Sequence, residues 1–277
     1  MTHFFLGLDA GSVSTKAVAL SLDGEILASA YLPTAADPLA ASNQALDEIK
    51  RNIAGEILGL AVTGSARELV GEKLGAAIIK NEITCQALAA AHLVPSARTV
   101  IEIGGQDSKL IILRDGLVHD FAMNTVCAAG TGSFLEHQAR RLHLSMEDFA
   151  GKSLGSTSPI KITGRCTVFA ESDMVHAQQT GAKPADIIYG LCLALVRNFL
   201  SDAGHNRPIE LPIVFQGGVA KNAGMVKAFR EALGQEIIVP ECPELSGALG
   251  AALLLKRNLA HNKSRHFQGM VGLDSSL

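Results

Sequence analysis

The chain has 277 residues, 48% of them hydrophobic and 18% charged, with 27 glycines and a formal net charge of −3. This profile is typical of a compact, glycine-rich α/β protein of two domains, and it excludes a disordered or fibrous chain. The balance of 24 basic and 27 acidic residues, together with the absence of tryptophan, argues against a nucleic-acid partner. We recognise neither a membrane-spanning apolar run nor a signal peptide, so we expect a cytoplasmic protein with no membrane partner.

The N-terminal third of the chain alternates between strand-like and helix-like segments. An apolar run ends at Asp9, and the next two strand-like segments are joined by an Asp-Gly turn, which is the pattern of antiparallel strands. Segments with apolar residues at helical spacing follow. The expected strands are 3–9, 15–21, 25–31 and 56–63, and the expected helices are 38–53, 67–74 and 82–92.

The same order of segments recurs from residue 98 onward. Expected strands lie at 98–104, 109–114, 117–123, 209–215 and 237–239, and expected helices lie at 131–144, 167–178, 184–204 (interrupted at Gly190), 223–233 and 245–257. A unit that occurs twice predicts two similar halves that face one another across a cleft. We therefore expect one domain of residues 1–94 plus 245–260, a second of residues 95–244, and a polar tail at 261–277 that frays from Asn258.

The turn after the first expected strand has the composition of a phosphate-binding turn. Glycine lets the backbone approach a phosphate closely, and the amides of such a turn point at its oxygens. A serine adds a hydroxyl donor, the lysine adds a point charge, and the aspartate offers a hard oxygen to a hydrated Mg²⁺. A plain Gly- and Asp-rich β-turn is the alternative. The candidate nucleotide-binding residues here are Asp9, Gly11, Ser12, Val13, Ser14 and Lys16.

Three further glycine-rich turns follow a strand or precede a helix. In the second repeat, Gln106 and Asp107 are candidates to orient an attacking water and to hold Mg²⁺ together with Asp9, as phosphoryl transfer to water requires. A helix N-terminus near residue 131 is a ready anion site, and the last turn is expected to approach the adenosine. The candidate residues are Gly104, Gly105, Gly130, Thr131, Gly132, Glu136, Gly217, Gly218, Val219 and Asn222, of which Glu136 is assigned to the ribose or to a solvated helix face.

The chain contains neither GxxxxGK[ST] nor GxGxxG, which argues against a P-loop protein and a Rossmann cofactor fold. Its turns resemble those of the actin/hexokinase/Hsp70 superfamily of ATPases, in the Asp9–Lys16 spacing, the hairpin at 104–109 and the late Gly217-Gly218. The resemblance implies an α/β, actin-like ATPase fold with two duplicated RNase H-like domains around a nucleotide cleft, closure coupled to ATP hydrolysis, and a last helix that packs back on the first domain.

Two of the five cysteines, Cys127 and Cys166, lie in loops that lead into helix-like segments. The chain has no CxxC pair, and disulfides are not expected in the cytoplasm. A helix N-terminus stabilises an anion, and two thiolates from each subunit of a symmetric dimer would complete a four-thiolate cluster. On spacing alone, two ordinary loop cysteines are the other interpretation. We expect Cys85 and Cys192 in the core and Cys242 in a loop without a function.

Five sequence motifs favour cluster ligands over ordinary loop cysteines. They closely resemble those of the activator component of 2-hydroxyacyl-CoA dehydratases and of the ATPase subunits of benzoyl-CoA reductase, the BadF/BadG/BcrA/BcrD type of ATPase. The resemblance covers about residues 4–257. The motifs are NEITC (81–85), IGGQDSK (103–109), CAAGTGSF (127–134), RCTVFAES (165–172) and FQGGVAKN (215–222).

The family resemblance implies a homodimer with one [4Fe–4S] cluster at the subunit interface, to which each subunit gives Cys127 and Cys166. It also implies oxygen sensitivity and ATP-driven one-electron transfer to an iron–sulfur dehydratase, or to a related double-cubane reductase. The electron source implied is a ferredoxin or a flavodoxin.

The chain departs from the family pattern beside the first cluster cysteine. Thr125 and Val126 replace the Asp-Lys pair that is usual there, Gly64-Ser65-Ala66-Arg67 replaces a common Gly-Tyr-Gly-Arg, and Gln86 stands where histidine is usual. Nearby charge and hydrogen bonds tune a cluster potential. The departures therefore bear on the partner enzyme and the potential, and not on the phosphate turns.

Two other functions fit parts of the pattern. A small-molecule kinase of the same superfamily, of the sugar or acetate type, would need a general base in the cleft, for which Asp107 is the best candidate. A non-catalytic, ATP-sensing scaffold would keep the phosphate turns with negligible hydrolysis.

Overall fold

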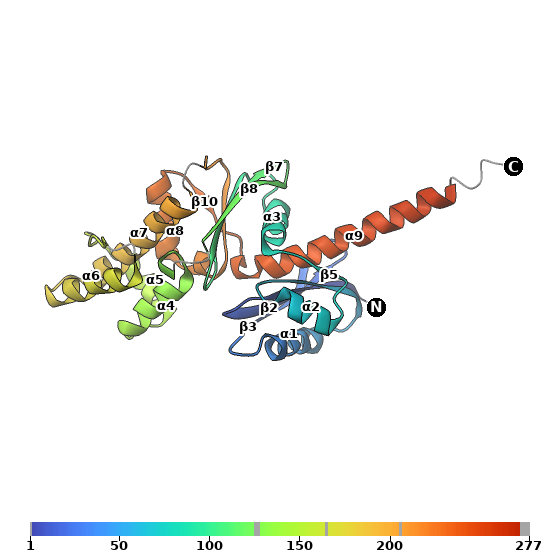
Figure 1. The fold of residues 1–277 in the computed structure, drawn as a ribbon, viewed down its shortest axis with the longest axis horizontal. Coiled ribbons are helices and arrows are strands. Elements are labelled where there is room, and N and C mark those ends of the chain that lie inside the picture. Colours follow the sequence, from blue (N-terminus) through green and yellow to red (C-terminus); the bar gives the residue numbers. More distant parts are fainter. Residues whose placement is uncertain (1, 125–127, 164–165, 205–206, 272–277) are drawn as a thin grey trace. The chain divides into compact units, whose positions relative to one another are not determined.

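The computed structural model of the chain describes residues 2–124, 128–163, 166–204 and 207–271 (Figure 1). Two compact units make up the chain, one of Met1–Ala89 with Gly247–Leu277 and one of Ala90–Ser246. We call them the first and the second unit.

The first unit is a five-stranded sheet in the order β3-β2-β1-β4-β5, with helices on both faces (Figure 1). Strands β1, β2 and β3 are antiparallel neighbours, whereas β4 and β5 continue the sheet in parallel. The elements are β1 (His3–Ala10), β2 (Ser14–Ser21), β3 (Ile26–Pro33), α1 (Pro38–Asn52), β4 (Glu56–Thr63), α2 (Arg67–Leu74), β5 (Ile78–Ile79), α3 (Glu82–Leu93) and α9 (Ser246–Val271).

The pleat of β1 supplies apolar side chains to both faces of this sheet. Phe4 and Leu8 pack in a core with Ile49 of α1. Phe5, on the opposite face, packs with Leu249 of α9. Side chains alternate along a strand, so a run buried on both faces reads as continuously apolar. The expected packing of the last helix on the first domain is therefore confirmed.

The second unit repeats this topology. Its sheet has the order β10-β9-β6-β7-β8, in which β6, β7 and β8 are antiparallel and β9 and β10 are parallel additions. The elements are β6 (Thr99–Ile103), β7 (Ser108–Arg114), β8 (Leu117–Asn124), α4 (Gly132–Arg141), α5 (Met146–Ser153), α6 (Thr167–Gln179), α7 (Pro184–Asp202), β9 (Ile213–Gln216), α8 (Ala223–Leu233) and β10 (Ile237–Ile238). The duplicated halves expected from the sequence are confirmed.

Helix α7 is the central core helix of the second unit. Tyr189, Cys192 and Phe199 are buried in it, and Phe199 stacks edge-on against Phe229 of α8 at a centroid distance of 5.6 Å. The expected interruption at Gly190 is wrong, because α7 runs through this residue. A side chain at Gly190 would collide with the backbone carbonyl of Ile160, so glycine allows this close packing. Among the described helices, α7 alone has the length and apolar composition of a membrane span, and 67% of its apolar window is buried inside the protein.

Three regions differ from the sequence-based expectation. The strand expected at 209–215 begins only at Ile213. The helix expected at 131–144 ends at Arg141, His143 adopts a left-handed φ of 55°, and α5 follows as a separate helix capped by Ser145. The tail was expected to fray from Asn258, and this was wrong, because α9 continues to Val271. Residues 258–268 contain no glycine or proline, so nothing in them breaks a helix.

Glycine at position 250 sets how closely α9 approaches α3. A side chain there would collide with the backbone carbonyl of Cys85. We expect Gly250→Ala to lower the free energy of unfolding by about 1–3 kcal/mol, the usual cost of overpacking. The matched control is Gly151→Ala in α5. A side chain at position 151 meets nothing within 4 Å, so this substitution should raise the free energy of unfolding by about 0.5–1 kcal/mol. Urea unfolding of both variants measures the difference, and equal stabilities would contradict the close approach.

Candidate functional site

The phosphate turn of the first unit is built on a β-hairpin. Asp9 at the end of β1 and Lys16 on β2 are cross-strand partners. The Lys16 ammonium lies 3.3 Å from a carboxylate oxygen of Asp9, and the two side chains are 15% and 11% exposed. Thr34 donates its hydroxyl to the carbonyl of Gly11 at 2.7 Å, which fixes the turn from the side of β3. The turn therefore presents a carboxylate paired with an ammonium, and Thr34 holds its backbone.

The helix α9 approaches this turn closely. A side chain at Gly247 would lie 2.8 Å from the carboxylate of Asp9. Gly64, with a φ of 100°, lies against the backbone of Ala10, and the amide of Ala66 donates to the Ala10 carbonyl at 3.0 Å. These contacts enclose the Asp9 end of β1, while Ser12 at the tip of the turn stays exposed.

In the second unit, three of the predicted turns converge. The amide of Gly132 donates to the carbonyl of Gly104 at 2.8 Å, and the amide of Ser133 donates to the carbonyl of Gly105 at 2.8 Å. A side chain at Gly132 would lie 3.0 Å from a methyl group of Val219. The turns at 104–105, 131–133 and 217–219 therefore meet in one place, although more than one hundred residues separate the first from the last.

Glycine is required at position 217. Its φ is 85°, a left-handed conformation, and a side chain there would collide with the carbonyl of Ile103 and lie 2.9 Å from the carboxylate of Glu102. The last turn thus packs directly on the end of β6. This proximity follows from the parallel pairing of β6 with β9.

A buried ion-pair cluster lies beneath these turns. The Lys109 ammonium lies 2.8 Å from Glu102 and 2.9 Å from Asp107. The lysine side chain is 1% exposed, that of Glu102 is 6% exposed and that of Asp107 is 29% exposed. One buried cation therefore neutralises part of the charge of two carboxylates, and it fixes the orientation of Asp107.

Sequence reasoning missed Glu102, although a signal was present. Asp9 pairs across the hairpin with Lys16, and Glu102 pairs with Lys109 in the same way. Both acids precede their lysine by seven residues and precede a glycine by two. The structural counterpart of Asp9 is therefore Glu102, a single acid inside an otherwise apolar strand.

The remaining predicted nucleotide residues are placed as follows. Gln106 and Glu136 are exposed, and Thr131 is buried. The carboxamide oxygen of Asn222 caps α8, accepting from the amides of residues 224 and 225 at 2.9 and 3.2 Å. Gly130 lies against the side chain of Asn124.

Of the four cysteines that the structure describes, two are buried and two are exposed. Cys85 and Cys192 are in the core as expected, and burial raises the pKa of each thiol to about 12. Cys166 is exposed, and it is the residue immediately before α6, at the N-terminus of a 13-residue helix. Cys127 lies outside the described residues. Within the described part of the chain, no three His, Cys, Asp or Glu side chains gather into a metal site.

Comparison with known proteins gives a consistent result. The sequence profile of the BadF/BadG/BcrA/BcrD ATPase family matches residues 6–254. The activator of lactoyl-CoA dehydratase from Anaerotignum propionicum is 38% identical over 259 residues, which cover 90% of this chain and 96% of that protein.

Two solved structures share the fold. The activator of the 2-hydroxyisocaproyl-CoA dehydratase from Clostridium difficile, with bound ADPNP, superposes with a TM-score of 0.87 at 32% identity, covering 95% of this chain and 97% of that one. Component A of the Acidaminococcus fermentans (R)-2-hydroxyglutaryl-CoA dehydratase superposes with a TM-score of 0.89 at 32% identity, covering 94% and 100% of the two chains. The fold is therefore actin-like, as expected from the sequence.

Proposed function

Because the chain belongs to the BadF/BadG/BcrA/BcrD ATPase family, we propose that it is an ATP-dependent one-electron donor. Its partner is an iron–sulfur 2-hydroxyacyl-CoA dehydratase or a related double-cubane reductase, and its own electron comes from a ferredoxin or a flavodoxin. The observation that carries the proposal is Cys166, an exposed thiol at the start of a helix in a unit that also carries three convergent phosphate turns.

ATP and Mg²⁺ are assigned to the glycine-rich turns of the two units. In the first unit, Lys16 and the amides of the Gly11 turn bind phosphate oxygens, and Asp9 holds Mg²⁺ through its hydration shell. In the second unit, Asp107 and Gln106 orient the attacking water. The hydrogen bond from Lys109 to Asp107 at 2.9 Å supports a fixed carboxylate in this role.

The same hydrogen bond weighs against a kinase. A general base for a substrate hydroxyl must accept a proton, and Asp107 is held by the buried ammonium of Lys109. The Oδ1 atom of Asp107 already accepts a hydrogen bond from Lys109 at 2.9 Å, so this oxygen is directed at the lysine and not at a substrate. Hydrolysis coupled to a change of conformation therefore fits this site better than phosphoryl transfer to a sugar or acetate.

A [4Fe–4S] cluster is assigned to Cys127 and Cys166 of each of two subunits. A thiolate at Cys166 lies at the positive end of the α6 dipole, which stabilises an anionic cluster by about 0.3–1 kcal/mol when exposed. When bound, such a cluster takes up and releases one electron. Two cysteines from each of two chains would supply the four thiolates that a [4Fe–4S] cluster needs.

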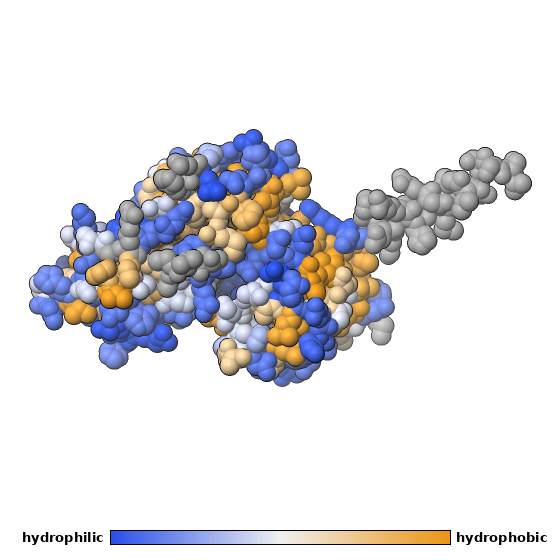
Figure 2. All heavy atoms as spheres, viewed as in Figure 1, coloured by the Kyte–Doolittle hydropathy of each residue, from blue (hydrophilic) through white to orange (hydrophobic). Residues whose placement is uncertain are grey.

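Apolar residues beside Cys166 support a homodimer. Val168 and Phe169, in the first turn of α6, are 64% and 66% exposed. On the face seen in Figure 2, the α6 end of the second unit carries hydrophilic side chains with several hydrophobic patches among them. Large apolar side chains next to the proposed cluster ligand are typical of a surface that a second subunit covers.

Phe169→Asp tests this surface. A charged side chain buried in an interface core costs about 2–5 kcal/mol when it has no partner, so we expect the dimer to dissociate at micromolar concentration. The control is Leu69→Asp. Leu69 of α2 is 50% exposed on the first unit, so this variant should leave the dimer intact. Light scattering coupled to gel filtration under nitrogen gives the mass, and an unchanged dimer in Phe169→Asp would remove this interface.

The function itself is tested on protein purified without oxygen. We expect about four iron and four sulfide per dimer, with a broad absorbance that bleaches on reduction. ATP hydrolysis should accompany electron transfer from reduced ferredoxin or flavodoxin to the partner enzyme. Iron-free protein after anaerobic reconstitution, with ATP consumption that depends on an added sugar, would establish the kinase instead.

A further inference from the structure

Helix α4 is attached at its N-terminus to the phosphate turn of the second unit. The amides of Gly132 and Ser133 donate to the carbonyls of Gly104 and Gly105 at 2.8 Å each. The hydroxyl of Ser133 also donates to the carbonyl of Gly105, at 2.5 Å. A displacement of the turn therefore moves the first residues of α4 with it.

The other end of α4 is attached to α6. His137 and Arg141 are four residues apart and lie on one face of the helix. The guanidinium of Arg141 donates to the carboxylate of Glu171 at 2.7 Å, and Nδ1 of His137 lies 3.6 Å from the other oxygen of the same carboxylate. The Glu171 side chain is 27% exposed and the Arg141 side chain is 45% exposed, so water screens the ion pair on the arginine side.

Cys166 is joined directly to α6, and Thr163 contacts the same helix. It directly precedes Thr167, the first residue of the helix. The segment before it is attached to the same helix, because Thr163 donates its amide and its hydroxyl to Asp173 at 2.7 and 2.8 Å. Arg197 of α7 donates to the carbonyl of Ile162 at 2.9 Å. Cys166 is therefore joined directly to α6, whereas Ile162 is hydrogen-bonded to α7.

We propose that α4 transmits the nucleotide state of the Gly104–Gly105 turn to Cys166, and that Glu171 is the positioning residue that couples α4 to α6. This inference rests on the proposed function, because it assigns the regulation of the same site. It joins the phosphate turn, a rigid helix about 15 Å long, the Glu171–Arg141 ion pair and the exposed thiol into one physical connection.

The chemistry of each step favours transmission through this connection. The carbonyls of Gly104 and Gly105 accept hydrogen bonds from amides that a helix N-terminus normally leaves unpaired, so the turn and the start of α4 are joined directly. A charge-assisted hydrogen bond between Arg141 and Glu171 is stronger and more directional than a neutral one. Rigid elements joined by such bonds carry energetic coupling between sites.

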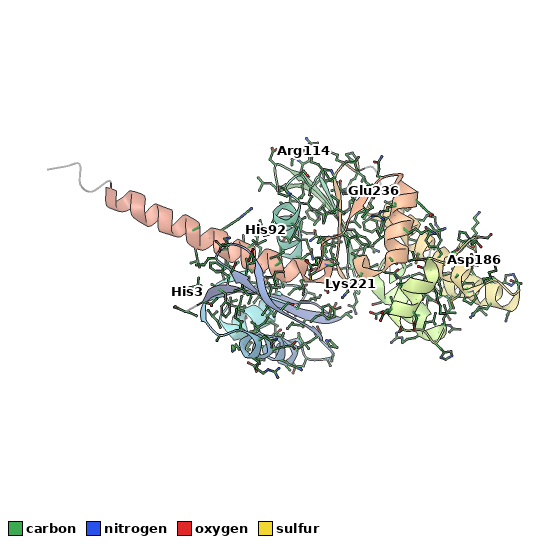
Figure 3. The ribbon with its side chains drawn as sticks, turned by 180° about the vertical axis from the view of Figure 1, so that it is seen from behind. His3, His92, Arg114, Asp186, Lys221 and Glu236 are labelled. Carbon is green, nitrogen blue, oxygen red and sulfur yellow. The ribbon has the colours of Figure 1, made fainter. Side chains whose placement is uncertain are left out.

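The test compares Glu171→Gln with Glu236→Gln. Glu236 also pairs with an arginine of the second unit, Arg230, at 3.2 Å, and it lies beside α8 (Figure 3). The first measurement is the rate at which a chelator removes iron from the reduced wild-type protein, with ADP and with a non-hydrolysable ATP analogue. A coupling of about tenfold between the two nucleotides lies in the usual range. We expect it to fall below about twofold in Glu171→Gln and to persist in Glu236→Gln.

A second measurement needs no cluster. Hydrogen–deuterium exchange at the first turn of α6 in iron-free protein should depend on the nucleotide in the wild type and not in Glu171→Gln. Arg141→Met removes the same contact from the other helix and should behave alike.

The outcomes separate the two proposals. Iron-free wild-type protein with nucleotide-dependent exchange in α6 would overturn the electron-donor function and leave the coupling in place. A full cluster with equal nucleotide responses in wild type and Glu171→Gln would overturn the coupling alone. Loss of the response in Glu236→Gln as well would also overturn it, because the effect would then not depend on the α4–α6 contact.

Discussion

Cys166→Ala is expected to abolish cluster binding while ATP binding persists. Cys166 is exposed and precedes α6 directly, and its loss from both subunits leaves two thiolates where a [4Fe–4S] cluster needs four. We expect the iron content of anaerobically purified protein to fall from about four per dimer to near zero. ATP-dependent reduction of the partner should disappear with it, and the affinity for a fluorescent ATP analogue should not change.

Cys242→Ala is the matched control. Cys242 is also an exposed loop cysteine of the second unit, and burial together with Glu244 and Glu241 raises the pKa of its thiol. A raised pKa disfavours the thiolate that binds iron, so this variant should retain the full iron content. If Cys166→Ala kept all of its iron, or Cys242→Ala lost it, the assignment of the ligands would be wrong.

Lys109→Met is expected to have the largest effect on stability. Its ammonium is 1% exposed and pairs with Glu102 and Asp107 at 2.8 and 2.9 Å. Removing one partner from a buried ion pair leaves an uncompensated buried charge, which costs about 3–5 kcal/mol. The two carboxylates then face the phosphate turns without their cation, so ATP affinity should fall as well. Urea unfolding and nucleotide titration measure the two effects.

Two variants show whether the buried charge is the cause. Lys50→Met removes an exposed pair, with side chains of Lys50 and Asp47 that are 55% and 68% exposed, and should cost less than about 1 kcal/mol. The double variant Lys109→Met/Glu102→Gln removes the uncompensated charge together with the lysine and should recover part of the loss. A loss below about 1 kcal/mol in Lys109→Met itself would contradict the buried pair.

Several boundaries were predictable because their signals are local. Pro38 and the capping side chain of Asp37 start α1, and Gly75 in a left-handed conformation ends α2. The sequence around Cys166 predicted that this residue lies immediately before a helix, and α6 begins at Thr167. Helix α5 was missed, because its eight residues lack a long apolar period.

The nucleotide turns were predictable one by one, but their association was not. Glycine-rich turns next to strands are visible in the sequence. That Gly104, Gly132 and Gly217 meet depends on β6 pairing with β9 and on hydrogen bonds between distant segments. No local pattern encodes such a contact.

The sequence by itself determined the duplicated α/β architecture, the phosphate turns, the two candidate cluster cysteines and the family. These rest on residue type and spacing within short segments, where turn chemistry and periodicity act directly. Only the tertiary structure decided that Glu102 is the counterpart of Asp9, that Lys109 neutralises it, and that Glu171 joins the two helices that follow the cysteines. Each of these depends on cross-strand register or on side chains that meet between two helices, and the free energy of such contacts exists only once the chain has folded.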